Sequence, residues 1–451
     1  VTGITAEKTR EIAKAFTSSK SAVCYGRIGV STQAFGGIAN WLINTLNLIT
    51  GNMDAPGGAM FTTPAFDVVG ITTMTGQTGR YNRWQSRVRG LPEFSGELPV
   101  STLAEEILTE GEGQIKAMVA VAGNPILSTP NGQQLDRAFE QLDYVVSVDI
   151  YINETTRHAN IILPPTTGLE TDHYDLVFNY LAVRNVAKFS DALFEPVEGA
   201  MHDWEILREL RVKMESNGKP FNPARKDYTA RLEPHKILDM GLRFGPYGTW
   251  GDDPISGEGI SLPKLKKLPH GIDLGALQPT LKQRICTPNR RIDLAPELIV
   301  NDVKRVTETF MIGDPHANEA FPFALIGRRH VRSNNSWMHN SERLVRGKDR
   351  CTVMIHPQDA EQLNITDGQD VCVKSRVGEI ILPTEITDTM MKGVISIPHG
   401  WGHSREGVQL EVAQKHAGVS INDLTDEQRI DPLTGNAAFN GVPVCVEPLT
   451  S

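Results

Sequence analysis

The residues around position 150 have the types and spacing that suit recognition of a nucleotide base. A buried strand is expected to end at Asp149, and a polar turn follows at residues 153–156. A carboxylate can accept both N–H donors on the Watson–Crick edge of guanine, whereas the edge of adenine cannot pair with it in that way. Because ligands of open α/β sheets collect at the carboxyl ends of strands, Asp149 is a candidate guanine contact. The alternative is an ordinary strand end with a solvated carboxylate.

A short turn with a glycine, Gly123-Asn124-Pro125, follows the strand expected at residues 117–122. Glycine allows backbone N–H groups to approach a phosphate closely, so this turn is a second candidate contact for a nucleotide. The turn has no GxGxxG spacing, which argues against an NAD site. A plain strand-ending turn is the alternative.

Two further loops are rich in polar side chains. Residues 328–340 begin with Arg328 and Arg329, whose guanidinium groups can pair bidentately with phosphate. Residues 398–403 contain two histidines four positions apart, but the glycines between them argue against a helical zinc pair of the HExxH kind. The alternative for residues 328–340 is a solvated polar loop that binds no ligand.

Composition excludes several classes of protein. The 451 residues carry 45 Lys and Arg against 54 Asp and Glu, and the net charge of −9 argues against a nucleic-acid-binding or anionic-membrane surface. The five cysteines are scattered without a CxxC pair, so the sequence shows neither a disulfide scaffold nor a cluster site. No apolar run approaches the ~20 residues of a membrane span.

The pattern along the chain predicts an α/β fold of doubly wound parallel sheet units, followed after residue 315 by a compact β-barrel. The expected elements are a helix capped by Thr5, a strand at 21–25, a helix at 35–49, strands at 117–122, 144–148 and 160–163, and helices at 133–141 and 203–214. Residues 216–300 have weak periodicity and are expected to form an irregular excursion. Short runs at 370–374, 379–382 and 394–397 predict barrel strands.

Four segments, taken in order, resemble the DMSO-reductase family of molybdopterin-dependent oxidoreductases. They are LINTLNLITGNMDAPGGAM at 42–60, VVSVDIYINETTRHANIILPPTTGLE at 145–170, LIGRRHVRSNNSWMHN at 325–340 and VMIHPQDAEQLNITDGQDVCVKSRVGEI at 353–380. The resemblance runs over nearly the whole chain. It implies the tail of a truncated α/β domain at 1–66, a second α/β domain at 67–314, and a six-stranded double-psi β-barrel that binds the molybdopterin dinucleotide at 315–451.

The resemblance also implies a cofactor and residues to hold it. In this family two molybdopterin guanine dinucleotides enclose one molybdenum or tungsten atom. The implied contacts are a phosphate or ribose turn (Gly123, Asn124, Pro125), a guanine site (Asp149, Thr155), a pterin or pyrophosphate loop (Arg328, Arg329, Ser333, Asn334, Ser336, His339), a cofactor wall (Trp401, His403) and a pterin-edge contact (Asn422).

Other implications concern what lies outside this sequence. The family's 4Fe-4S cysteines and its metal ligand belong to an amino-terminal part that we expect to be missing, so we expect this chain alone to be inactive. An electron-transfer partner or iron–sulfur subunit and a cytoplasmic location are further expectations. Pro64 stands where formate-oxidising members carry an arginine, which disfavours formate as substrate. The alternatives are a non-catalytic homologue, as in respiratory complex I, and an unrelated nucleotide-dependent enzyme.

Overall fold

The computed structural model describes residues 3–215, 233–312 and 319–449. Contacts between residues divide the chain into two compact units. Unit 1 comprises Val1–Tyr25, Ile43–Thr78 and Pro164–Leu294, and unit 2 comprises Gly26–Leu42, Gly79–Leu163 and Ala295–Ser451. The expected three-domain division at residues 66 and 314 stays a prediction.

Unit 2 contains the parallel sheet that the sequence predicted. Strands β3 (Ala117–Val121), β4 (Tyr144–Val148) and β5 (Ile161–Ile162) pair in that order, with β4 parallel to both neighbours. Helices α5 (Leu103–Leu108), α6 (Pro125–Ser128) and α7 (Gly132–Phe139) supply side chains that pack with Val145 in one apolar cluster. The three strands and α7 agree with the expected positions to within two residues at each end.

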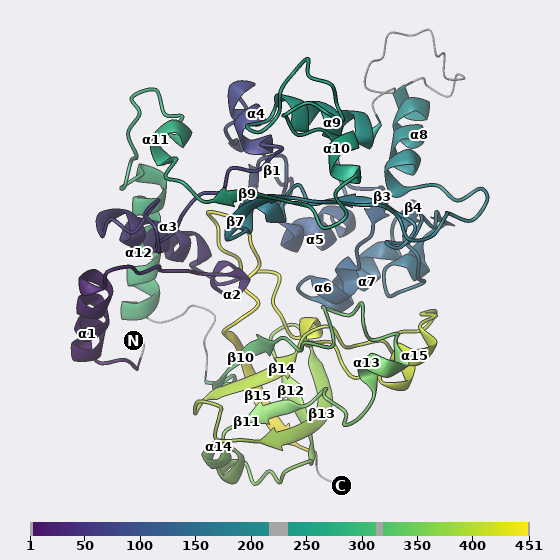
Figure 1. The fold of residues 1–451 in the computed structure, drawn as a ribbon. Helices are drawn as coiled ribbons and strands as arrows, with labels where there is room; N and C mark the ends of the chain where they lie inside the picture. Colours follow the sequence, from purple (N-terminus) through teal and green to yellow (C-terminus); the bar gives the residue numbers. More distant parts are fainter. Residues whose placement is uncertain (1–2, 216–232, 313–318, 450–451) are drawn as a thin grey trace. The chain divides into compact units, whose positions relative to one another are not determined.

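Unit 2 also contains a closed six-stranded barrel, which confirms the second half of the predicted fold (Figure 1). Its strands are β10 (Phe323–Arg328), β11 (Val353–Ile355), β12 (Asp370–Lys374), β13 (Glu379–Ile386), β14 (Val394–Pro398) and β15 (Val442–Pro448). They close in the order β10-β14-β11-β13-β12-β15. The pairs β10–β14 and β11–β13 are parallel, and the other four are antiparallel.

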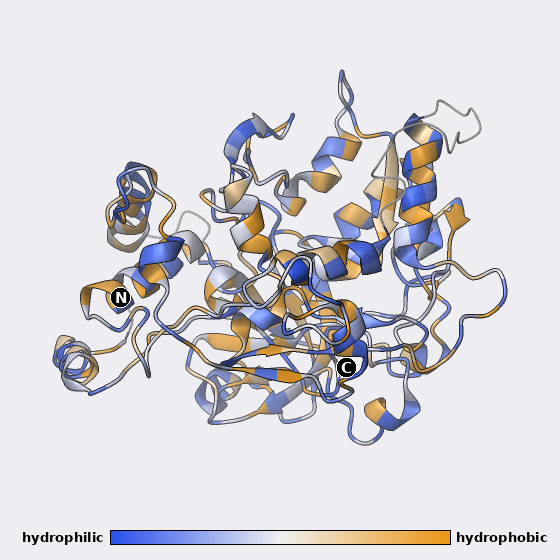
Figure 2. Ribbon diagram, turned by 45° about the horizontal axis from the view of Figure 1, so that its top comes forward, coloured by the Kyte–Doolittle hydropathy of each residue, from blue (hydrophilic) through white to orange (hydrophobic). Residues whose placement is uncertain are grey.

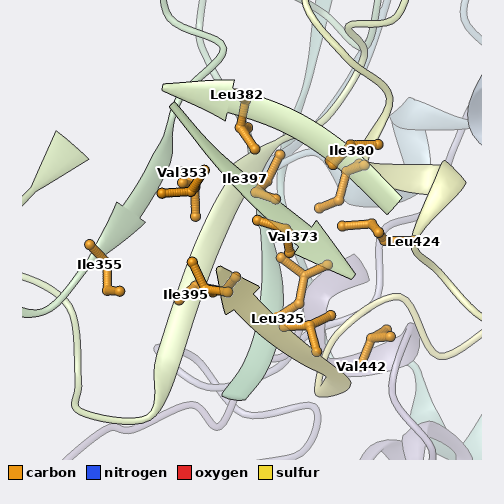
Figure 3. Packing of buried hydrophobic residues seen from close by; sticks show 14 of the residues in the cluster. Leu325, Val353, Ile355, Val373, Ile380, Leu382, Ile395, Ile397, Leu424 and Val442 are labelled. Atoms are coloured by element: carbon orange, nitrogen blue, oxygen red, sulfur yellow. The ribbon is translucent and has the colours of Figure 1, made fainter. Parts of the chain in front are cut away.

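The barrel forms because alternate side chains along its strands are apolar and point inward. In Figure 3, Val353, Val373 and Ile397 from three different strands point toward one another. Leu325, Val353, Ile395 and Ile397 are each 0% exposed. The barrel therefore has a continuous core of its own, from which the loops at 328–340 and 398–403 emerge.

Unit 1 is built mainly from helices and short antiparallel strand pairs, β6 with β8 and β7 with β9. Its elements are α1 (Ala6–Ser18), α4 (Val68–Met74), β6 (His173–Tyr174), η3 (Phe178–Leu181), β7 (Arg184–Ala187), β8 (Phe189–Ser190), α8 (Asp203–Glu215), α9 (Pro234–Phe244), α10 (Leu262–Lys266), β9 (Ile272–Ala276) and α11 (Leu281–Arg284). Helix α8 carries both hydrophobic and hydrophilic residues (Figure 2), and it buries Ile206 and Val212. Thr5 caps α1 as predicted, by accepting a hydrogen bond from Lys8.

Two expectations for unit 1 need correction. Residues 233–300 were expected to be irregular but contain α9, α10, β9 and α11, and β9 pairs with β7; residues 216–232 lie outside the described part. The strand expected at 21–25 does not form. The Asn47 side chain bonds both the N–H and the C=O of Cys24, at 2.9 and 2.8 Å. The Asn47 amide thus satisfies backbone groups of Cys24 that a neighbouring strand would bond if residues 21–25 formed the predicted strand.

The remaining elements complete the description. They are α2 (Ile28–Ser31), α3 (Gly36–Ile49), β1 (Tyr81–Gln85), β2 (Pro92–Phe94), η1 (Val100–Thr102), η2 (Thr156–His158), α12 (Glu297–Ile312), α13 (Glu342–Val345), α14 (Pro357–Gln362), α15 (Glu411–Lys415) and η5 (Ile421–Asp423). Helix α3 confirms the helix expected at 35–49. Across the described ranges, no helix combines the length and apolar character needed to cross a bilayer.

Candidate functional site

Two turns at the carboxyl ends of β3 and β4 lie next to each other in unit 2. We call them the strand-end turns, residues 122–125 and 149–155. The parallel register pairs Val121 with Val148, and the Ala122 N–H donates to the Val148 carbonyl at 2.9 Å. Ala122 has φ = 48°, a left-handed conformation that is uncommon for a residue with a side chain. The chain thus turns sharply out of the sheet just before Gly123.

Side-chain hydrogen bonds hold the strand-end turns together. Asn124 Nδ2 donates to Glu154 Oε2 at 2.5 Å, and Thr155 Oγ1 donates to Asn124 Oδ1 at 2.8 Å. The backbone N–H of Ile126 donates to the same Thr155 hydroxyl at 3.2 Å. Glu154 and Thr155 are both 0% exposed. The turns are therefore preformed, and the Thr155 hydroxyl is used within the protein.

Asp149 is held in a fixed orientation by its own turn. Its Oδ1 accepts from the N–H groups of Ile150 and Tyr151 at 2.7 and 3.3 Å, and its Oδ2 accepts from Asn153 Nδ2 at 3.0 Å. An ionised carboxylate offers about four acceptor positions, so acceptor capacity remains for two more N–H donors. The side chain is half-buried, and Ile150 and Tyr151 beside it are exposed.

The polar loop after β10, residues 328–340, is called the basic loop below. Its two arginines have different surroundings. Arg328 donates to the backbone carbonyls of Ser396 and Thr352 in the barrel, and burial lowers the pKa of its guanidinium. Arg329 is exposed and bonds Asn335 in its own loop. It lines a cavity of about 340 Å³ together with His330, Val331, Ser333, Asn334, Asn335, Met338 and His399.

Four buried side chains connect the basic loop to the strand-end turns. His339 Nε2 lies 3.0 Å from Ser333 Oγ, His339 Nδ1 lies 2.9 Å from His403 Nε2, and His403 Nδ1 lies 2.8 Å from Glu154 Oε1. None of the four is more than 3% exposed. We call this set, Ser333–His339–His403–Glu154, the histidine chain. Trp401 packs against its middle, with 4.2 Å between the Trp401 and His339 ring centroids.

Burial and bonding shift the pKa values along the histidine chain. Burial and the neighbouring His403 lower the pKa of His339 to about 4, so His339 is neutral near pH 7. Burial raises the pKa of Glu154, but hydrogen bonds from His403 and Asn124 outweigh burial and lower the pKa overall. The Glu154 carboxylate is therefore ionised. The neutral imidazole of His339 has one donor and one acceptor nitrogen.

A charge cluster lies beside the histidine chain and ties the barrel to helix α7. Asp136 accepts from Arg157 at 2.5 Å, from His158 at 2.6 Å and from Arg405 at 2.7 Å. Arg405 also bonds Asp423 at 2.8 Å. This cluster is structural, because each charge faces partners within the protein.

Known proteins of one family match this chain. The family model described as molybdopterin oxidoreductase matches residues 4–213, and the one described as molybdopterin dinucleotide binding domain matches residues 323–443. The chain is 25% identical to trimethylamine-N-oxide reductase of Haemophilus influenzae over 89% of this chain and 51% of that protein. It is 24% identical to formate dehydrogenase H of Escherichia coli over 100% of this chain and 59% of that protein.

The chain belongs to the DMSO-reductase family of molybdopterin oxidoreductases. It spans about half the length of the curated relatives it matches. Acetylene hydratase from Pelobacter acetylenicus has the same fold, with a TM-score of 0.72 at 15% identity over 99% of this chain and 63% of that chain.

The structure brings most of the residues that the family implies into one neighbourhood of unit 2. Asn124 and Thr155 lie in the strand-end turns beside Asp149, and the histidine chain joins these turns to Ser333 of the basic loop. Gly400 allows the second barrel loop to pack closely here: it has φ = 100°, and a Cβ would meet the Asn335 carbonyl oxygen at 2.1 Å. The individual cofactor contacts stay predictions.

Some candidate residues face the protein rather than a cavity. Asn422 is 1% exposed and donates to the Leu127 carbonyl at 2.8 Å, and His403 is 1% exposed between His339 and Glu154. These two side chains therefore position their neighbours in this structure. Trp337, by contrast, is 72% exposed.

Sequence reasoning missed Glu154 as a functional candidate. It lies in the turn that was singled out, but its partner His403 is 249 residues away. An acid in a polar turn gives no signal that it is buried. Only the barrel's position against the sheet shows that Glu154 faces a histidine.

The acids of LETDHYD at residues 169–175 form no catalytic cluster. Asp172 pairs with His235, Glu170 accepts from Thr167, and Asp175 accepts from the backbone of residues 177 and 178. Within the described ranges, no group of three His, Cys, Asp or Glu is arranged to hold a metal ion.

Proposed function

We propose that this chain binds molybdopterin guanine dinucleotide and orients it for two-electron redox chemistry at molybdenum or tungsten. When bound, the metal and its pterin supply that redox chemistry. The observation that carries the proposal is Asp149, a carboxylate that its own turn orients beside the Gly123 turn while acceptor capacity remains. Guanine offers two adjacent N–H donors that match it.

The charge of the basic loop supports an anionic ligand. The basic loop, residues 328–340, contains three arginines and no Asp or Glu, in a chain whose net charge is −9. Such a local excess of positive charge attracts phosphate. Arg329 lines the 340 Å³ cavity. Its planar guanidinium is suited to the pyrophosphate of a dinucleotide.

Each residue then has a role that follows from its chemistry. Asp149 accepts from the base, and Arg329 pairs with phosphate. Ser333 and Asn334 offer hydrogen bonds from the same cavity wall. Arg328 keeps the basic loop on the barrel by bonding the backbone of β14.

The finer features of the whole protein are also proposals. They are a second dinucleotide, a 4Fe-4S cluster outside this sequence, an electron-transfer partner and a cytoplasmic location. Proteins similar to this chain include a trimethylamine-N-oxide reductase and a formate dehydrogenase. Pro64 makes formate the less favoured substrate for this chain.

Replacing Asp149 tests the proposed function. Asp149→Ala should remove most of the bound guanine nucleotide, because a charge-assisted hydrogen bond contributes about 1.5–3 kcal/mol. Asp149→Asn should also bind poorly, because the N–H donors of its amide group would face an N–H donor of guanine. Asp143→Ala, at the opposite end of β4, is the matched control and should keep its cofactor. Guanine nucleotide released from each purified protein is measured by mass spectrometry, and unchanged content in both Asp149 variants would refute the proposal.

A further inference from the structure

The histidine chain has a hydrogen-bonding pattern with a single direction. Glu154 is an acceptor, so His403 Nδ1 must carry a proton and donate to it. When His403 is neutral, its Nε2 accepts from His339 Nδ1, and His339 Nε2 then accepts from the Ser333 hydroxyl. Every N–H and O–H along the chain points from the cavity toward Glu154.

From this geometry we propose that the histidine chain is a one-proton relay between the cavity lined by Ser333 and the carboxylate of Glu154. The relay goes beyond the proposed function. It rests on that function in one respect: two-electron redox chemistry at the cavity would supply or consume the proton. The residues act on the reaction through one another, so His339 and His403 are positioning residues.

The transfer balances without any electron transfer. A hydronium ion in the cavity gives a proton to Ser333 Oγ and becomes water, as the hydroxyl passes its own proton to His339 Nε2. His339 then passes its Nδ1 proton to His403 Nε2. The result is an imidazolium at His403 paired with the Glu154 carboxylate, a His339 ring with its proton moved from Nδ1 to Nε2, and an intact Ser333 hydroxyl.

The surroundings assign different tasks to the two histidines. His339 faces His403, His399 and the backbone of Gly400, and Trp401 covers its ring. With a pKa of about 4, His339 passes a proton on rather than keeping it at neutral pH. His403 contacts the ionised Glu154 at 2.8 Å, so its imidazolium form has a counter-charge. Arg405, two residues after His403 in the sequence, directs its donors to Asp136 and Asp423.

Burial limits where protons can enter the histidine chain. Side chains that are 0–3% exposed leave no room for bulk water along the chain. Ser333 borders both cavities and His339 borders one of them, whereas His403 and Glu154 border neither, so protons enter the chain from the Ser333–His339 end. A purely structural role, by contrast, needs only fixed hydrogen bonds and no change of tautomer.

Nitrogen-15 NMR of histidine-labelled protein tests the relay directly. The spectrum distinguishes a protonated from a bare ring nitrogen, so it reports tautomer and charge for each histidine. The relay predicts a coupled change on acidification: when His403 gains its Nε2 proton, the His339 proton should move from Nδ1 to Nε2 in the same molecules. A His403 Nε2 that stays bare throughout the acidification, or a His339 tautomer that stays fixed while His403 gains the proton, would overturn the proposal.

Variants at the entry supply a second test. Ser333→Ala removes the hydroxyl, so exchange of the His403 ring protons with solvent should slow at least several-fold. Ser333→Thr keeps a hydroxyl and should restore the exchange rate. Equal exchange rates in wild type and both variants would mean that protons do not pass Ser333. These readouts need no cofactor, so they can fail while the cofactor proposal stands, and the Asp149 experiment can fail while the relay stands.

Discussion

The strand-end turns and the basic loop supply candidate contacts to the same ligand, yet they are built differently. In the turns, Glu154 and Thr155 are 0% exposed and each is hydrogen-bonded within the protein. In the basic loop, Val331 is 88% and Trp337 is 72% exposed. The turns are preorganised by buried hydrogen bonds, whereas much of the loop is exposed at the surface.

This difference teaches where a substitution should act. A change in the turns should lower the stability of the fold, because it leaves buried polar groups without partners. A change at an exposed position of the basic loop should weaken binding and leave stability nearly unchanged. Asp149 lies between these extremes, since it belongs to a preformed network and is half-buried.

The largest effect is expected from Glu154→Ala. Removing one partner of a buried charged pair costs about 3–5 kcal/mol of unfolding free energy, because His403 and Asn124 lose their common partner. Chemical denaturation measures this. Glu447→Ala, which removes the exposed ion pair with Lys374, is the matched control and should cost far less, because water screens an exposed pair. Equal losses in the two variants would contradict the comparison.

Arg329→Ala should act on binding alone. Loss of one charge-assisted contact should weaken cofactor binding by about 1.5–3 kcal/mol, roughly 10- to 150-fold, with a stability change within about 0.5 kcal/mol. Arg328→Ala should instead destabilise the fold, because Arg328 bonds carbonyls of the barrel. Dye-monitored unfolding together with cofactor content distinguishes them. If both variants lost stability equally, the two arginines would not have separate roles.

Asp136 makes the stability of the charge cluster depend on pH in the acid range. Burial raises the pKa of Asp136, but its bonds to His158, Arg405 and Arg157 lower it overall from 3.8 to about 2. A lowered folded-state pKa stabilises the protein above the unfolded pKa, and this stabilisation is lost as pH falls from about 4 to about 2. It amounts to about 2 kcal/mol. The stability difference between wild type and Asp136→Asn should shrink by this amount on acidification, and a constant difference would count against the cluster.

Local patterns were sufficient to predict much of the fold. The strands at 144–148 and 370–374 and the helix after Thr5 follow from periodicity and capping, and all three are present. The strand at 21–25 failed because Asn47 satisfies Cys24, a contact that depends on tertiary structure.

The candidate site was predictable only in part. The Gly123 turn, Asp149 and the basic loop were identified from residue types, and parallel pairing brings the first two together. The histidine chain was not foreseen, because Glu154 and His403 meet across 249 residues. Spacing along the sequence cannot predict such contacts.

The nucleotide base released from the purified protein tests the central claim most directly. Protein isolated from its native host is denatured, its cofactor is hydrolysed, and the released mononucleotides are identified by mass spectrometry. The account predicts guanosine monophosphate, in a fixed ratio to pterin. Adenosine or cytidine monophosphate in its place, or pterin without any nucleotide, would contradict the reading of Asp149 and of the cavity beside Arg329.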